Sequence, residues 1–147
     1  MRKWILFYKK ITKSEKFCFL ETFCIFAATK PIYMQFFETI FLEEADVFVA
    51  SLDMKMQQKI FYNVRVAEQT NDPELFKKLN DDIWEFRTLF NKLTIRILAF
   101  WDKTDKTRTL VLATNGFIKK TQKTPVNEIE RAKRIMERYF MEKRTKK

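Results

Sequence analysis

Three stretches rich in β-branched and aromatic residues follow one another near the middle of the chain and constrain the fold more than any other feature. They span residues 83–90, 93–101 and 108–117. Asn91-Lys92 separates the first two and residues 102–107 separate the last two, which are the lengths of hairpin loops. The sequence therefore predicts an antiparallel meander of three strands.

Helices are predicted before this meander. Apolar residues recur every four positions from Phe48 to Val64, which provides one face for burial, and two good capping residues interrupt the pattern. We therefore expect two helices, 43–51 and 54–68, that form a hairpin. A first strand is expected within residues 36–42, ahead of the hairpin.

A closing helix is predicted at the C-terminus, because Thr124-Pro125 is typical of a cap followed by proline at the first helical position. Its expected buried side consists of Ile129, Ala132, Met136, Tyr139 and Phe140. Residues 69–82 hold a turn signal and a weakly patterned segment, and are expected to be a connecting loop. The architecture predicted is β-α-α-β-β-β-α, a small α+β fold in which an N-terminal helical hairpin and a C-terminal helix pack on one antiparallel sheet.

Residues 1–33 mix Phe, Lys and Cys without a clear period, and we expect a peripheral extension ahead of a folded domain at 34–147. Met34 is a candidate start of translation, since the regular patterns begin there. The apolar runs of the extension are too interrupted for a signal peptide, and no stretch approaches the roughly 20 apolar residues of a membrane span. With both cysteines, Cys18 and Cys24, too isolated for a disulfide framework, a soluble cytoplasmic protein is expected, with no membrane partner.

The net charge of +10 is distributed unevenly. Residues 1–32 carry +5, residues 33–115 carry −2, and residues 116–147 carry +7. A polyanion is the natural partner of such a basic end, with nucleic acid as the first candidate and an acidic protein as the second. A solvated charged helix is the alternative interpretation.

The amino-acid types that are missing limit the chemistry. There is no histidine, the side chain used most often for acid–base catalysis and metal binding, and one glycine, which excludes phosphate-binding glycine loops. The tight acidic groups, Asp81-Asp82 and Asp102 with Asp105, lie in predicted loops, so no metal or other cofactor is expected. Any catalysis must then use Lys, Arg, Tyr, Asp or Glu.

Two arginines and three lysines are the candidate site: Arg87 and Arg96 on predicted strands, and Lys119, Lys120 and Lys123 after the last strand. Arginine forks bind phosphate and can stabilise a pentacoordinate phosphorus without metal. A lysine crowded by other cations has a lowered pKa and can take the proton of a ribose 2′-hydroxyl. The products would be a cyclic phosphate and a 5′-hydroxyl fragment.

In the alternative interpretation the lysines are solvated. The arginines then pair with Glu85, Asp81 or Asp82 for structural reasons.

The chain also resembles a known family. The residues concerned are 40–45, 75–79, 82–87, 95–102, 116–125 and 127–133, of which GFIKKTQKTP at 116–125 is the most distinctive. They resemble the RelE/ParE superfamily of bacterial type II toxins, in its HigB-like, phage-derived branch. The resemblance covers roughly residues 34–143.

This resemblance implies a toxin that enters the ribosome and cleaves mRNA there as an endoribonuclease, neutralised by a cognate antitoxin that is HigA-like, with a helix-turn-helix or similar domain. Its partners would be the ribosome, mRNA and the antitoxin. By position, Arg87, Arg96, Lys119 and Lys120 would be catalytic. Lys123, Arg131, Arg134 and Tyr139 would bind RNA, although a core role suits Tyr139 better.

One position departs from the family pattern, because Asn115 stands where relatives of this branch commonly have histidine. The position is then structural, or the protein is slower than its relatives, or catalysis rests on the lysines. Two other functions stay open, a ParE-like inhibitor of DNA gyrase and a catalytically inactive RNA- or ribosome-binding module.

Overall fold

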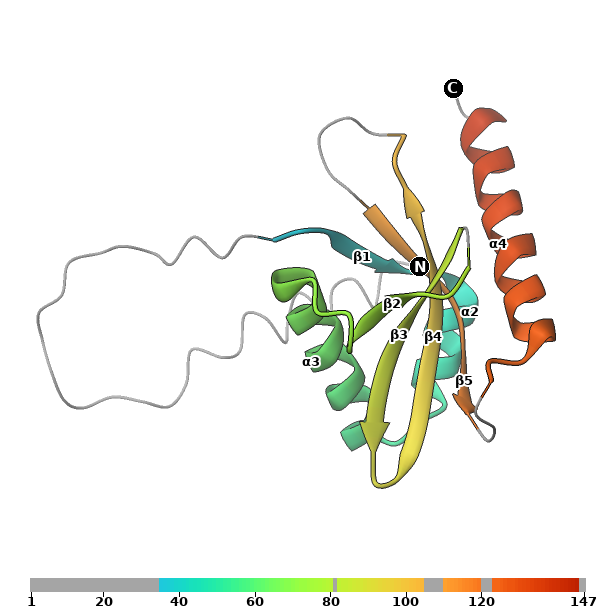
Figure 1. The fold of residues 1–147 in the computed structure, drawn as a ribbon. Helices are drawn as coiled ribbons and strands as arrows, with labels where there is room; N and C mark the ends of the chain where they lie inside the picture. The colour runs from blue at the N-terminus through green and yellow to red at the C-terminus, as the bar shows by residue number, and fades with distance from the viewer. Residues whose placement is uncertain (1–34, 81, 105–109, 120–122, 146–147) are drawn as a thin grey trace, which may run out of the picture. The chain divides into compact units, whose positions relative to one another are not determined.

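The computed structural model describes residues 35–80, 82–104, 110–119 and 123–145 (Figure 1). The predicted extension at 1–33, the candidate start at Met34 and the candidate site residue Lys120 lie outside these ranges. The elements in chain order are β1 (Glu38–Phe41), α2 (Glu43–Ala50), α3 (Met54–Thr70), β2 (Phe76–Lys78), β3 (Ile83–Phe90), β4 (Leu93–Asp102), β5 (Leu110–Lys119) and α4 (Val126–Thr145).

The strands form one sheet in the order β1-β5-β4-β3-β2. The predicted meander is confirmed, since β3, β4 and β5 pair antiparallel with their neighbours. The α+β class is confirmed as well, but β1 runs parallel to β5, so the sheet is mixed and the expectation of a purely antiparallel sheet is wrong. The direction of β1 depends on pairing with a distant strand, which local patterns do not report.

Strand β2 lies in the segment that was expected to be a loop. Asn71 ends α3 in the left-handed conformation (φ 52°), and the chain then turns back so that Phe76 pairs with Phe86. The two rings stack with centroids 4.4 Å apart, and Phe76 is buried. A strand of three residues is too short to show a period of two, which explains why the prediction missed it.

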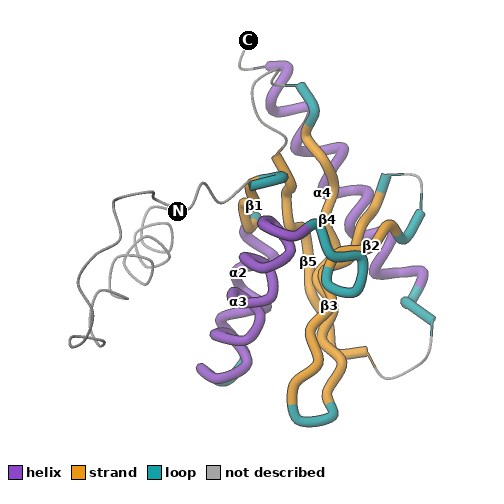
Figure 2. Tube along the Cα trace, turned by 60° about the vertical axis from the view of Figure 1, so that its left-hand side comes forward, coloured by secondary structure: helices purple, strands orange, loops and turns teal. Residues whose placement is uncertain are grey.

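The predicted helical hairpin is confirmed, with α2 and α3 ending within two residues of the expected bounds. Asp53 caps α3 by accepting a hydrogen bond from the backbone N of Met56 at 3.0 Å. Figure 2 shows α2 and α3 on one side of the sheet and α4 on the other. The sheet is therefore the middle layer of three.

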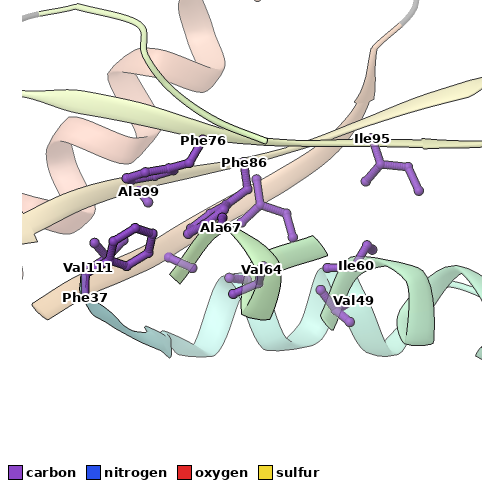
Figure 3. Packing of buried hydrophobic residues seen from close by; sticks show 13 residues of the cluster. Phe37, Val49, Ile60, Val64, Ala67, Phe76, Phe86, Ile95, Ala99 and Val111 are labelled. Atoms are coloured by element: carbon purple, nitrogen blue, oxygen red, sulfur yellow. The ribbon is translucent and has the colours of Figure 1, made fainter. Parts of the chain in front are cut away.

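The larger hydrophobic core lies between the sheet and the helices α2 and α3 (Figure 3). Its fully or nearly fully buried members are Phe37, Ala45, Val49, Ile60, Val64, Ala67, Phe76, Phe86, Ile95, Ile97, Ala99, Val111 and Ala113. Helix α2 approaches β5 closely at Gly116, where an added Cβ would lie 2.1 Å from the ring of Phe48. The glycine of the family-like segment is therefore a packing requirement.

Helix α4 covers the opposite face over a second cluster formed by Ile83, Leu98, Phe100, Leu112 and Ala132. The predicted buried side is confirmed, since Ala132 is fully buried and Ile129, Met136, Tyr139 and Phe140 pack against the cluster. The helix begins one residue later than expected, with the Pro125 carbonyl accepting from the backbone N of Glu128. Thr124 does not cap it; its hydroxyl lies 3.3 Å from Glu85 Oε2.

A β-bulge in β5 changes which side chains face α4. Leu98 pairs with Asn115, but the next residue, Ala99, pairs with Ala113, so Thr114 is an extra residue. Thr114 is buried, and its hydroxyl lies 3.0 Å from the Leu98 carbonyl oxygen, which it can donate to. Beyond the bulge Asn115, Phe117 and Lys119 share the face that Leu112 has before it.

Within the described ranges, no helix combines the length and the apolar character needed to cross a membrane.

Candidate functional site

Helix α4 covers only part of its face of the sheet. It is tied to the sheet at one end by Glu128, which contacts Asn115, and at the other by Lys143, which contacts Asp102. Beyond its N-terminal end the β3–β4 hairpin projects further (Figure 1). The side chains of this projecting part form two rows across the sheet, which we call the arginine row (Arg87, Arg96 and Phe117) and the tip row (Leu89, Thr94 and Lys119).

The turn between β3 and β4 creates the arginine row. Asn91 and Lys92 both have positive φ, 46° and 66°, as in the two-residue hairpin turns that match the twist of the strands. This turn pairs Phe90 with Leu93, and counting back along both strands then places Arg87 directly opposite Arg96. The two predicted strand arginines are therefore cross-strand neighbours on one face.

Glu85 lies between the two guanidinium groups. Its Oε1 is 3.6 Å from Arg87 Nε and 3.5 Å from Arg96 Nε. Both distances are too long for hydrogen bonds, and both Nε atoms are buried without a hydrogen-bond partner among the described residues. Arg87 Nη1 also lies 3.5 Å from the exposed Glu74. The alternative interpretation had both arginines near Glu85, and the structure places them there.

Burial differs between the arginines. The Arg96 side chain is 9% exposed and that of Arg87 is 29% exposed. Burial lowers the pKa of Arg96, Glu85 opposes this, and the neighbouring positive charge of Arg87 adds to it. Because arginine stays protonated in proteins, two positive charges share one buried carboxylate, and the cluster can accept a further anion.

The predicted lysines are placed only in part. Lys119 is the last residue of β5, paired with Thr94, and so it belongs to the strand instead of following it. Lys123 is exposed shortly before α4, and Lys120 lies outside the described residues. The structure thus brings Lys119 onto the same face as Arg87 and Arg96.

Asn115 is buried and serves the packing of α4. Its Nδ2 donates to Glu128 Oε2 at 2.8 Å, and its Oδ1 lies 2.9 Å from the Thr114 hydroxyl. With 1% of its surface exposed, it does not reach the surface formed by the two rows. Of the roles considered for this position, the structural one agrees with these contacts.

Two of the remaining predicted RNA-binding residues, Arg131 and Tyr139, have their contacts outside the arginine row. Arg131 Nε donates to Glu44 Oε2 at 2.7 Å, which ties α4 to α2, and Arg138 reaches the other oxygen of Glu44. Arg134 is exposed on α4. Tyr139 belongs to the buried contacts at the far end of this helix.

Tyr139 donates its hydroxyl to Asp102 Oδ2 at 2.7 Å, and its ring packs edge-on against Phe100. Burial raises the pKa of Tyr139, and the bond to Asp102 raises it further. These contacts agree with the core role that the sequence favoured for this residue.

Three residues near the arginine row were not predicted as site residues. Glu85 was considered only as a structural partner of the arginines. Lys77 is exposed and pairs with Glu85 across β2 and β3, but its segment was expected to be a loop. Phe117 pairs with Arg96, and its side of β5 depends on the bulge. Only Glu85 carried a sequence signal, its shared face with Arg87.

Among the described residues, no group of His, Cys, Asp or Glu could hold a metal ion.

Residues 48–137 match the family described as Phage derived protein Gp49-like (DUF891). The match covers more than half of the chain, and the protein belongs to this family. It includes the arginine row, Asn115 and Lys119, but ends before Tyr139. Searches of curated proteins and of solved structures return no significant match.

Membership of this phage-derived family is consistent with a toxin-like function and assigns no specific activity.

Proposed function

We propose that this protein is the toxin of a type II toxin–antitoxin system and cleaves mRNA on the ribosome as a metal-independent endoribonuclease. The observation that supports the proposal most directly is the arginine row. Two cross-strand guanidinium groups carry buried Nε atoms without hydrogen-bond partners among the described residues, next to one carboxylate. A phosphodiester oxygen is the ligand that would satisfy such donors.

In the proposed reaction the ribose 2′-oxygen attacks the adjacent phosphorus, and the bond from phosphorus to the 5′-oxygen breaks. The 2′-proton passes to a general base, for which Lys119, Lys120 and Lys123 are the candidates from the sequence, and the leaving 5′-oxygen takes a proton from water. The products are a 2′,3′-cyclic phosphate and a 5′-hydroxyl. Arg87 and Arg96 stabilise the additional negative charge on phosphorus, and Glu85 orients them.

The proposed partners follow from the same surface. Arg87, Lys77 and Lys119 would face mRNA in the ribosome, and an acidic or helical segment of the antitoxin would cover them in the neutralised complex. Phosphate contacts of this kind do not select a base sequence. The protein would act in the cytoplasm, where ribosomes are found.

One observation favours a second candidate, a catalytically inactive module that binds RNA or ribosomes. Asn115 replaces the histidine expected from the resemblance, and its amide is fully engaged with Glu128 and Thr114. A site that had lost its acid–base group could keep its arginines and bind without cleaving. No described contact favours the gyrase inhibitor.

The deciding experiment is primer extension on a translated message in a reconstituted translation reaction. Wild type is compared with Arg87→Gln, Arg96→Gln and the control Lys78→Gln, which removes a strand lysine from the opposite face of the sheet. We expect 5′-hydroxyl cuts with wild type and Lys78→Gln, and a loss of about 100-fold with either arginine variant.

Full cleavage by both folded arginine variants would overturn the proposed mechanism. Ribosome binding without cleavage by wild type would support the inactive module. DNA damage without mRNA cleavage would point to gyrase.

A further inference from the structure

We propose that Thr94 and Lys119 of the tip row form a second phosphate subsite, beside the arginine row, that positions the neighbouring nucleotide of the RNA. This inference rests on the proposed function. It assigns Lys119 a positioning role, which leaves proton transfer to another group, and it adds Thr94, which no sequence motif indicates.

Geometry carries the first step. Thr94 pairs with Lys119 across β4 and β5, so the two residues are cross-strand neighbours on the same face as the arginines. Each lies two residues beyond the arginine row along its strand, which is about 7 Å in a β-strand. An extended single strand of RNA places successive phosphates at a comparable spacing, and a cationic surface that follows the backbone is the usual way to bind it.

Chemistry carries the second step. In the arginine row Arg96 lies between Arg87 and Phe117 on the neighbouring strands, and in the tip row Thr94 lies between Leu89 and Lys119. Leu89 is 66% exposed at the projecting end of the hairpin, where neither core cluster includes it. Each row thus combines donors for a phosphate with an apolar surface for a base or sugar.

The alternative explanation is that the side chains of the tip row are solvated and bind nothing. It predicts that the three side chains act independently of the arginines. The subsite predicts that their effect depends on whether the ligand carries a second phosphate.

The test uses 2′-O-methylated RNA, which lacks the attacking hydroxyl and is not cut. A dinucleotide with one phosphate and a trinucleotide with two, both with the same 3′-fluorophore, are titrated at low salt and read by fluorescence anisotropy. Wild type should bind the trinucleotide about 10-fold more tightly than the dinucleotide. Thr94→Val and Lys119→Gln together should reduce this ratio below about 3-fold, and Lys119→Gln alone should lower the salt slope by roughly one.

Lys78→Gln is the matched control and should keep the full ratio, and thermal unfolding confirms that each variant is folded. A trinucleotide advantage that is absent from wild type, or that survives in the double variant, overturns the subsite. Arg96→Gln separates the two proposals, because it should weaken both ligands. If Arg96→Gln has no effect while the double variant loses the ratio, the subsite stands and the arginine phosphate site fails.

Discussion

Two buried carboxylates lie on the same face of the sheet, and their surroundings differ. Asp102, under the C-terminal end of α4, accepts hydrogen bonds from Tyr139 at 2.7 Å, from the backbone N and hydroxyl of Thr104 at 2.9 and 2.6 Å, and from Lys143. Glu85, beyond the other end of α4, has two arginine Nε atoms at 3.5 and 3.6 Å that it does not bond.

The difference separates a structural cluster from a candidate functional one. Among the described residues the donors around Asp102 bond to it, and Tyr139 and Lys143 thereby hold α4 on the sheet. Around Glu85 the Thr124 hydroxyl bonds Oε2, but the two arginine Nε atoms have no hydrogen-bond partner among the described residues, which is costly in a folded protein unless something binds there. The charges differ as well, because Asp102 faces one lysine whereas Glu85 lies near two arginines.

The largest effect is expected at Asp102. Asp102→Asn removes the acceptor charge from Lys143 and a hydrogen-bond acceptor from Tyr139 or Thr104, and should lower the free energy of unfolding by about 3 kcal/mol. Urea denaturation at neutral pH measures it. Glu142→Gln, an exposed charge on the last turns of the same helix, is the control and should change it by less than about 0.5 kcal/mol. A loss below about 1 kcal/mol would show that the cluster around Asp102 does not hold α4.

At the cluster around Glu85 the expected effects on activity and stability diverge. Arg96→Gln should reduce mRNA cleavage about 100-fold, equivalent to about 2.7 kcal/mol of transition-state stabilisation. Arg96→Gln removes one long hydrogen bond, from Nη1 to the Ile95 carbonyl oxygen at 3.3 Å, so the free energy of unfolding should fall by about 1 kcal/mol, less than in Asp102→Asn. Equal losses of stability in Arg96→Gln and Asp102→Asn would erase the distinction between the clusters.

Low pH should selectively weaken the contribution of the cluster around Asp102 to stability. Burial opposes ionisation of Asp102, but the bonds from Lys143, Thr104 and Tyr139 outweigh it and hold the pKa well below its usual range. A carboxylate with a depressed folded-state pKa contributes stability that is present above its unfolded pKa and lost as pH falls below it. The stability difference between wild type and Asp102→Asn should therefore shrink by at least about 1.4 kcal/mol from pH ~5 to ~2. A difference independent of pH would contradict this.

The smallest effect is expected at Glu68, where the pH dependence of stability has the opposite sign to that of Asp102. Burial raises the pKa of Glu68, although its bond from the backbone N of Thr39 at 2.8 Å acts against this. A raised carboxyl pKa means that the folded state binds the proton more tightly, so stability falls as pH rises through the window above about 4.5. Glu68→Gln keeps an acceptor for Thr39 and should match or exceed wild type by up to about 0.5 kcal/mol at pH 7. A clear loss in chemical denaturation would show that the charge itself is needed.

The sequence pattern placed both arginines on strands, and the structure shows that they lie opposite each other. A two-residue loop at Asn91-Lys92 sets the register of its strands, so the placement of Arg87 opposite Arg96 follows from the turn and the alternation of side chains. The helical hairpin followed from a regular apolar period. In both cases the information lies within a short stretch of chain.

What the sequence did not reveal depends on distant partners. The short strand β2 exists because Phe76 stacks on Phe86, and without it Lys77 could not be placed beside Glu85. The contacts of Tyr139 and Arg131 depend on how α4 meets Asp102 and α2. Residue type indicated RNA binding for the basic residues and less so for Tyr139, and tertiary packing decided which of them lie together.

The bulge at Thr114 also has a consequence for the mutational tolerance of β5. Because Ala113 and Asn115 pair with adjacent residues of β4, removing Thr114 would leave a regular ladder with Phe117 and Lys119 still on the arginine side. A deletion between Asn115 and Lys119 would instead move every later residue of β5 to the opposite face, because side chains alternate along a strand. Variation among relatives should therefore accumulate as replacements around a constant spacing between the bulge and the lysines.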